Sequence, residues 1–331
     1  MNERVKAHAQ SVFLATENLR GIMLMIAARI VFAGSDTFTK LASEGLPAAE
    51  VVVLRNVVSL PIVLLMAWGL GGFRHVYGAF GNRVVVTRSV LEGTGTLAFV
   101  SALPFITLGQ SAVILLTVPI ILVALSAMIY HEAVGWRRWT AIVVGFMGVV
   151  LVANPFSGSF NYFLLLAQFT AITWAFRDLM TSRIGGGIPT VTVALVNTII
   201  VGSLAVPASL LQGWRGFGMQ EALYLLGSGG LVAFANFLYI DALRTGAVSV
   251  VAPFRYTAAV WASIAGFMVW GDIPDSLGLL GTLFIIGSGL YTFYREFELA
   301  RARRQKSLLS SPASANSVRA REGDPIGESK S

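Results

Sequence analysis

Three charged side chains interrupt an otherwise apolar stretch near the start of the chain. Residues 29–42 read RIVFAGSDTFTKLA, and apolar runs flank them on both sides. On a helix, Arg29, Asp36 and Lys40 share one face, and Asp36 stands four residues before Lys40, the favourable order for an ion pair. A charge at the centre of a bilayer costs about 2.5–3.5 kcal/mol, so such groups face a partner or a polar cavity.

Each of these charges has a functional and a structural interpretation. We predict that Asp36 lines a polar path through the molecule, with a structural ion pair near the membrane surface as the alternative. For Arg29 the two interpretations stay equally open. For Lys40 we favour the structural one, because a lysine near a helix end can extend its ammonium group towards water.

A second charged pair lies in the apolar stretch RSVLEGTGTLAF. Arg88 precedes Glu92 by four residues, and this order is the weaker one for helix stability. The glycines and threonines that follow suit close helix packing or a small opening. Lining of a binding site by Glu92 and a buried structural pair both remain open.

Aromatic and polar side chains gather on three later apolar stretches. The candidates for substrate binding there are Trp174 and Asp178, Asn236 and Tyr239, and Arg255 and Tyr256. Pro253 precedes Arg255, and proline breaks in apolar helices often line cavities. We expect the Arg255 charge to be met across the molecule, by the solute or by a carboxylate such as Asp36 or Asp241. Aromatic walls with few polar groups suit a planar, polar ligand such as a flavin, although simple packing is the alternative for each aromatic residue.

The composition indicates which elements position these residues. The chain has 331 residues, of which 55% are hydrophobic and 12% charged, whereas a soluble domain is about 25% charged. This composition is typical of a helical membrane protein with several spans. The absence of cysteine excludes disulfides and Cys-ligated metals. The net charge of +7 lies in loops and in the C-terminal tail, so we do not expect nucleic-acid binding.

Ten apolar segments follow one another along the chain. They cover about residues 20–42, 49–69, 84–104, 108–130, 136–153, 161–182, 188–211, 220–243, 247–270 and 277–297. With the N-terminus in the cytoplasm, 17 Lys and Arg residues of the connections and tails fall inside and only Arg215 falls outside. Because positive charge favours the cytoplasmic side, we predict ten spans with both termini inside.

An internal repeat divides these segments into two halves. Residues 102–132 resemble 242–272, and at an offset of 142 residues Asp36 aligns with Asp178 and Arg55 with Asn197. Five spans in each half require the halves to enter the membrane from opposite sides, as in many secondary transporters. We predict a cytoplasmic tail over 1–19, one five-helix repeat over 20–154, a second over 155–297 and a disordered cytoplasmic tail over 298–331.

The motifs resemble those of the drug/metabolite transporter superfamily, in particular its EamA-type members. The resemblance rests on Asp36 and Lys40 at the end of the first segment, on Arg55, and on Tyr130-His131-Glu132 followed by GWRRWTAIVVGFMGVVLVANP. It implies an all-α integral membrane fold of ten helices in two inverted repeats. Residues 19–56 are most similar to a bacterial subgroup that includes riboflavin and S-adenosylmethionine uptake proteins.

The resemblance and the composition together predict a transporter of the bacterial inner membrane. We expect it to move a small metabolite by alternating access, with uptake of a vitamin or cofactor such as riboflavin as the first interpretation. S-adenosylmethionine uptake, and efflux of amino acids or toxic metabolites, are the alternatives. Coupling to a proton or an ion stays open, as does the choice between monomer and homodimer.

Other classes of function find little support in the residues. The chain lacks the GxxxxGK[ST] phosphate loop of ATPases. Its three histidines lie in predicted tails and loops, so a membrane-embedded enzyme would lack a catalytic constellation. A sensor or scaffold would need an effector domain that this sequence does not offer. We therefore expect no catalytic site, no metal site and no bound cofactor.

Overall fold

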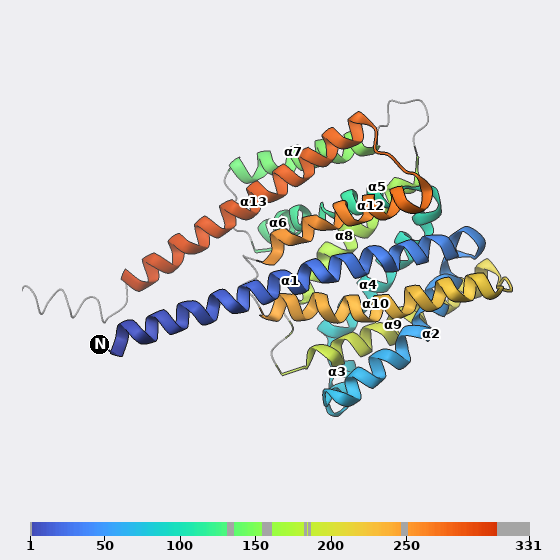
Figure 1. Cartoon of the computed structure of the whole chain (residues 1–331), viewed down its shortest axis with the longest axis horizontal. Helices are drawn as coiled ribbons and strands as arrows, with labels where there is room; N and C mark the ends of the chain where they lie inside the picture. The colour runs from blue at the N-terminus through green and yellow to red at the C-terminus, as the bar shows by residue number, and fades with distance from the viewer. Residues whose placement is uncertain are drawn as a thin grey trace, which may run out of the picture.

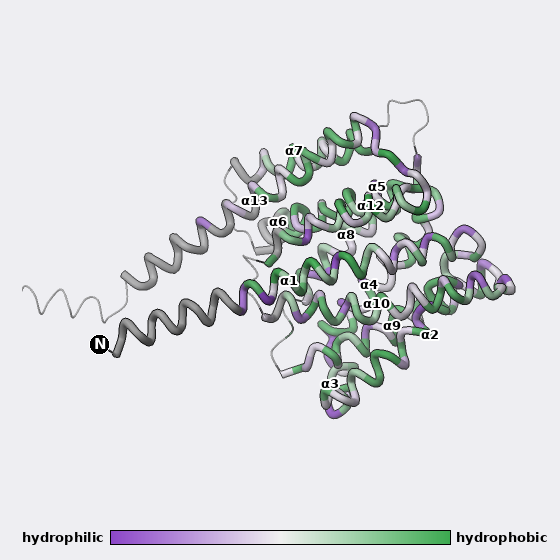
Figure 2. The backbone as a smooth tube through the Cα atoms, in the orientation of Figure 1, coloured by the Kyte–Doolittle hydropathy of each residue, from purple (hydrophilic) through white to green (hydrophobic). Residues whose placement is uncertain are grey.

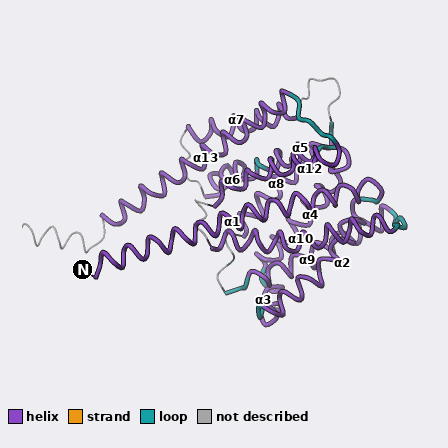
Figure 3. Tube along the Cα trace, in the orientation of Figure 1, coloured by secondary structure: helices purple, strands orange, loops and turns teal. Residues whose placement is uncertain are grey.

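Helices pack side by side in the computed structural model, which describes residues 2–130, 136–153, 161–181, 184, 187–245 and 251–309 (Figure 1). Every regular element in these ranges is a helix, and loops join them (Figure 3). The all-α fold class is therefore confirmed for the described part of the chain.

The helices follow the predicted segments in order. In the first half they are α1 (Asn2–Gly45), α2 (Ala48–Gly69), η1 (Gly72–His75), α3 (Val76–Gly81), α4 (Arg83–Ala102), η2 (Leu103–Phe105), α5 (Leu108–Leu115), α6 (Val118–Tyr130) and α7 (Trp136–Ala153). In the second half they are α8 (Phe163–Thr181), α9 (Thr190–Gln212), α10 (Met219–Thr245), η3 (Ala252–Tyr256), α12 (Thr257–Trp270) and α13 (Ser276–Leu309).

Two predicted segments are broken helices rather than continuous ones. Segment 108–130 forms α5 and α6, with a break at residues 116–117 just before Pro119. In segment 247–270 the tight helix η3, which contains Pro253, precedes α12. Proline lacks the backbone N–H that continues an α-helix, which accounts for a break at each place.

Both ends of the chain are more helical than their polar sequences suggested. Helix α1 begins at Asn2, so the predicted N-terminal tail continues directly into the first segment. Helix α13 extends past the predicted end at residue 297 to Leu309, through the strong helix formers of ELARARRQK. The remainder of the predicted disordered tail, residues 310–331, lies outside the described residues.

Five of the described helices are long and apolar enough to cross a membrane. They are Glu17–Gly45, Ala48–Gly69, Phe163–Thr181, Thr190–Gln212 and Met219–Ala242, and three shorter apolar helices accompany them at Leu108–Leu122, Trp139–Val152 and Ser276–Tyr291. Two of the ten predicted segments are too short because of the breaks described above. Helix α4 is not among the five because it is less apolar, with the charged residues Arg83, Arg88 and Glu92. Hydrophobic residues predominate along most of these helices (Figure 2).

The principal helix contacts join the first half of the chain to the second. Helix α1 packs along α10, α4 along α8, α2 along α9, α7 along α13, and α5 against α12. Suppose that each segment of the first half corresponds to the segment five places later along the chain. Exchanging the two halves then turns the α1–α10 pair into the α8–α4 pair and leaves the set of pairs unchanged. The packing thus has the pattern of a two-fold relation between halves.

Close packing at one of these contacts depends on a glycine. A Cβ on Gly95 of α4 would lie 2.5 Å from Thr173 Oγ1 and 2.6 Å from Trp174 Nε1, both on α8. Thr170 of α8 also donates a hydrogen bond to the Gly95 carbonyl at 3.0 Å. The small-residue stretch predicted to suit close packing therefore does so at Gly95.

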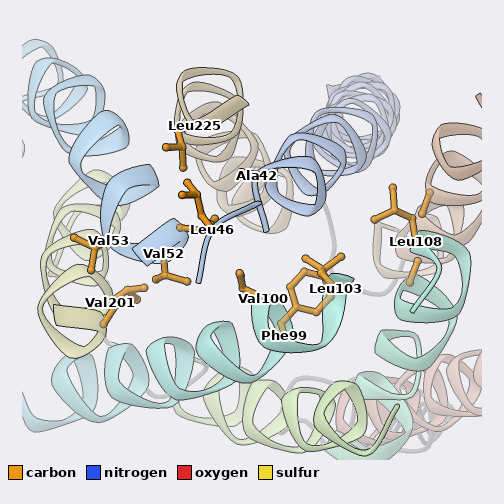
Figure 4. Packing of buried hydrophobic residues seen from close by; sticks show 14 residues of the cluster. Ala42, Leu46, Val52, Val53, Phe99, Val100, Leu103, Leu108, Val201 and Leu225 are labelled. Carbon is orange, nitrogen blue, oxygen red and sulfur yellow. The ribbon is translucent and has the colours of Figure 1, made fainter. Parts of the chain in front are cut away.

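A hydrophobic cluster joins seven α-helices and η2 at the end of the bundle where α1 ends and α2 begins (Figure 4). Its fully buried members include Ala42 and Val52, and Phe99 and Leu103 of α4 and η2 pack with them. Leu108, Val201 and Leu225 bring α5, α9 and α10 into the same cluster. We call this group the end cluster.

Candidate functional site

A cavity lies between the two halves, next to the end cluster. Residues of α1, α2, α4, α5, α6, α8, α9, α10, η3 and α12 line it. Its charged and amide side chains are Arg29, Asp36, Arg55, Asn56, Arg88, Glu92, Arg177, Asn197, Asn236 and Arg255. Phe99, Leu108 and Val201 belong to both the cavity wall and the end cluster. We call this space the central cavity.

The two helix breaks both contribute to the wall of the central cavity. Leu116 at the first break and Pro119 just after it line the cavity, as does Arg255 of η3 at the second. In transporters built from repeats, helices interrupted at corresponding positions of the two halves commonly form the solute site. The wall of this cavity has that construction.

An ion-pair network crosses from α4 to α8 and on to η3. Arg177 Nη1 lies 2.7 Å from Glu92 Oε2, and Arg177 Nη2 lies 2.8 Å from Asp178 Oδ1. Arg255 Nη2 lies 3.3 Å from the other carboxylate oxygen of Asp178. The Arg255 charge is therefore met across the bundle as predicted, but by Asp178 rather than by Asp36 or Asp241. Asp241 instead lies 3.6 Å from Arg20, outside the central cavity.

Arg88 extends this network towards α9. Its Nε donates to Thr181 Oγ1 at 2.9 Å and its Nη1 donates to Asn197 Oδ1 at 3.1 Å. Its Nη2 is 3.9 Å from Glu92, the residue four positions along the same helix. Glu92 is thus shared by two arginines, and the Arg88–Glu92 pair is buried and lines the central cavity.

Two arginines lie over the ring of one tyrosine. The guanidinium carbon of Arg29 is 4.8 Å from the centre of the Tyr239 ring, and that of Arg255 is 5.6 Å from it. Phe32 meets the same tyrosine edge-on, with ring centres 6.2 Å apart. Such contacts with an aromatic face stabilise a guanidinium by about 0.5–2 kcal/mol.

Asp36 lines the central cavity beside Arg55. Among the described residues no cation lies within ion-pair distance of its carboxylate, so the predicted pair with Lys40 does not form. Arg55 Nη1 donates instead to Thr39 Oγ1 at 3.3 Å. Asp36 is therefore a cavity carboxylate that makes no ion pair with a described cation.

Lys40 lies at the far side of the end cluster and makes structural contacts. Its Nζ donates to the Ile106 carbonyl at 2.9 Å, is 3.9 Å from Asp272 and lies 4.4 Å from the centre of the Trp270 ring. Trp270 Nε1 in turn donates to Glu44 at 2.7 Å. These contacts fit a structural role for Lys40 and tie α1 to α12 beyond the cavity, but the side chain is buried, so the ammonium group does not extend towards water as expected.

The predicted binding residues fall into three positions. Seven line the central cavity: Arg29, Asp36, Glu92, Trp174, Asn236, Tyr239 and Arg255. Asp178 lies behind Arg177 and Arg255 as their shared counter-ion. Tyr256 is not among the residues that line the central cavity, and it is buried with Val113, Leu116, Val152 and Ile285 in another hydrophobic cluster.

Five further charged or amide residues of the cavity wall were not among the predicted binding residues. They are Arg55, Asn56, Arg88, Arg177 and Asn197. The alignment of Arg55 with Asn197 between the two halves is a signal that could have identified that pair. Arg88 and Arg177 could have been found as charges within apolar segments.

Known proteins resemble this chain over most of its length. The model of the EamA-like transporter family matches residues 19–154 and again 161–294. The S-adenosylmethionine uptake transporter of Rickettsia prowazekii is 24% identical over 84% of this chain and 94% of its own length. The riboflavin transporter of Vibrio cholerae is 25% identical, over 88% and 97%.

More distant matches point the same way. The pseudopaline exporter CntI of Pseudomonas aeruginosa is 21% identical over 80% of this chain and 93% of its own length. A solved crystal structure with 16% identity superposes with a TM-score of 0.58 over 83% of this chain and 95% of that one, which shows that the fold is shared. The family model thus matches twice, once in each half of the chain. The central cavity is thus formed between two EamA domains, and the chain belongs to the EamA-like transporter family.

Proposed function

We propose that this protein is a secondary transporter of the bacterial inner membrane that imports a vitamin or cofactor, with riboflavin as the first candidate. The observation that carries the proposal is the central cavity, whose wall combines residues of both EamA domains with two interrupted helices. A site between two repeats is where rocking of one half against the other exposes a solute to alternate sides.

The proposed topology is ten spans in two inverted five-helix repeats, with both termini in the cytoplasm. The symmetric pairing of helices and the breaks in α5–α6 and η3–α12 support the inversion. The distribution of Lys and Arg supports the orientation. In this topology the end cluster and the contacts of Lys40 face the periplasm and close the cavity on that side.

The choice of riboflavin rests on the shape and chemistry of the cavity wall. Two aromatic pairs line it, Phe32 with Tyr239 and Phe99 with Trp174, and each comes from a different pair of packed helices. Planar rings suit aromatic walls, and a few polar groups such as Asn236 can fix their orientation. The similarity to a named riboflavin transporter supports the same choice.

S-adenosylmethionine is the second candidate because it also carries a planar ring system, and because relatives of this chain are named as its uptake transporters. Efflux is the alternative direction, since a named exporter is also similar.

Uptake by the full chain tests this function. Right-side-out membrane vesicles containing the protein should accumulate radiolabelled riboflavin saturably, and the chain should restore growth of a riboflavin auxotroph at low external vitamin. Trp174→Ala, in the cavity wall, should reduce the initial rate at equal membrane abundance. Trp68→Ala is the matched control, because Trp68 is 77% exposed and lies outside the cavity.

Failure has two distinguishable forms. Uptake of S-adenosylmethionine without riboflavin would replace the substrate and retain the transporter. Vesicles that move neither solute in either direction, or an equal loss in the two tryptophan variants, would contradict the proposed site.

A further inference from the structure

The wall of the central cavity carries more positive than negative charge. Its described arginines are Arg29, Arg55, Arg88, Arg177 and Arg255, and its described carboxylates are Asp36 and Glu92, with Asp178 directly behind. Three of the arginines, Arg88, Arg177 and Arg255, share Glu92 and Asp178 between them. The carboxylates therefore do not match the guanidinium groups one to one.

Two of these arginines, Arg29 and Arg55, have no described carboxylate within ion-pair distance, and the Nε of each is buried without a hydrogen-bond partner. Arg55 donates a hydrogen bond to Thr39 Oγ1 through Nη1. The Arg29 guanidinium lies over the rings of Tyr239 and Phe32. Arg255 reaches the same tyrosine ring, so two guanidinium groups gather at one place.

A guanidinium group cannot lose its proton in a protein, so Arg29 cannot escape this cost by becoming neutral. Leaving such a charge uncompensated within a membrane is energetically costly. Two guanidinium groups converging on one point are also the arrangement that binds carboxylates and phosphates through paired N–H donors. An anionic group on the solute can supply the counter-charge that no described carboxylate provides to Arg29.

We infer that the solute carries an anionic group, a carboxylate or a phosphate, which Arg29 and Arg255 bind beside the ring of Tyr239. This inference rests on the proposed function, because it concerns the solute of the same cavity. Within the vitamins and cofactors proposed above it favours an anionic solute over riboflavin itself, since riboflavin has no ionised group at neutral pH. Its phosphate ester carries a phosphate, and S-adenosylmethionine carries a carboxylate.

Binding of probe pairs that differ in one anionic group to the purified full chain in nanodiscs tests the inference. The two pairs are flavin mononucleotide with riboflavin, and S-adenosylmethionine with decarboxylated S-adenosylmethionine, which lacks only the carboxylate. In at least one pair the member with the anionic group should bind at least about tenfold more tightly, a difference of ~1.4 kcal/mol. A preference within the flavin pair would indicate a site for phosphate, and a preference within the other pair would indicate a site for carboxylate.

Variants assign the preference to the two arginines. Arg29→Gln and Arg255→Gln should each reduce it to within about twofold, which is ~0.4 kcal/mol. Arg29→Lys, which keeps the charge, should retain part of it and also reports on the site if the glutamine variant fails to fold. Arg20→Gln is the matched control, because Arg20 pairs with Asp241 outside the cavity.

The outcomes separate this inference from the proposed function. Equal affinity for the two members of both pairs, or an unchanged preference in Arg29→Gln, would overturn the anion site while leaving a transporter in place. If none of the four probes binds, the proposed substrates are excluded. The anion site is then tested with inorganic phosphate and with acetate. Thermal stabilisation of the unmodified chain by either ion, lost in Arg29→Gln, would support the anion site. Stabilisation equal in both proteins, or absent from both, would overturn it.

Discussion

Arg177 of α8 lies between two carboxylates, with Nη1 2.7 Å from Glu92 Oε2 of α4 and Nη2 2.8 Å from Asp178 Oδ1. The Arg177 side chain is only 10% exposed, and the ring of Trp174 covers the guanidinium at 4.9 Å. A residue of the second EamA domain thus ties that domain to the first through a buried ion pair. Arg177 is a structural centre of the cavity wall, rather than a charge that extends to water.

Removal of Arg177 should destabilise the fold more than removal of Arg255. Arg177→Met leaves Glu92 with only the 3.9 Å contact to Arg88, and breaking a buried pair costs about 3–5 kcal/mol. Arg255→Met leaves Asp178 still paired with Arg177. Thermal unfolding of the purified variants should therefore show the larger loss for Arg177→Met.

The control for this comparison is Arg20→Met. Arg20 is 63% exposed in its pair with Asp241, and exposed pairs contribute about 0–1 kcal/mol, so this variant should unfold as the unmodified chain does. A greater loss of stability for Arg255→Met than for Arg177→Met would contradict the central position of Arg177 in the ion-pair network.

The sequence identified charged positions well, because charge within an apolar run is visible without a structure. Arg29, Asp36, Glu92 and Arg255 were found in that way, and all four line the cavity. The partners of these charges were not predictable. Arg177 and Glu92 stand 85 positions apart, and their pairing depends on how α4 lies against α8.

Tyr256 shows a different limit of prediction. It follows Arg255 directly, so the sequence suggests a shared site. Helix η3 advances with about three residues per turn, which directs neighbouring side chains about 120° apart. Arg255 therefore lines the cavity while Tyr256 packs in a hydrophobic cluster with Ile285 of α13.

The contact between α4 and α8 should tolerate no side chain at Gly95. A leucine there would meet Thr173 and Trp174, since even its Cβ would lie 2.5 Å from Thr173 Oγ1. Gly95→Leu should abolish the monodisperse, folded protein in detergent extracts, and Gly95→Ala should lower its unfolding temperature. Gly78→Ala is the control, because nothing lies within 4 Å of a Cβ at that position. Normal yield and stability of Gly95→Leu would contradict the packing described for these helices.

Single cysteines should report the proposed topology without background, because the chain has no cysteine of its own. Tyr77 is 94% exposed and lies in a connection predicted to be cytoplasmic. Gly216 is exposed in a connection predicted to be periplasmic. An impermeant thiol reagent should label Gly216→Cys in intact cells and should label Tyr77→Cys only after the membrane is opened. Equal labelling of both in intact cells would refute the ten-span arrangement.

The contacts of Lys40 should hold the cavity closed at the end cluster. Lys40→Ala removes the hydrogen bond to the Ile106 carbonyl and the contacts with Asp272 and Trp270. We expect this variant to increase the rate at which an external thiol reagent reaches Ser111→Cys, which lies buried in the cavity wall. Arg215→Ala, an exposed cation at the same end of the bundle, serves as the control. An unchanged rate in Lys40→Ala would mean that the hydrophobic cluster alone closes this end.

Asp36→Asn should abolish transport without loss of stability. The variant keeps the size of the side chain and removes only its charge. Because no described cation lies within ion-pair distance of Asp36, no buried pair is broken and the fold should be unaffected. The carboxylate nevertheless lines the cavity beside Arg55, where a charge without a fixed partner is free to interact with the solute or with an arginine that moves during the cycle.

We expect initial uptake to fall at least about tenfold, ~1.4 kcal/mol, with Asp36→Glu partly active and the unfolding temperature unchanged. Asp241→Asn, at the exposed pair with Arg20, is the matched control and should transport normally. Full transport by Asp36→Asn at normal membrane abundance would exclude a role for this charge, and a parallel loss of stability would show that Asp36 supports the fold instead of the transport cycle.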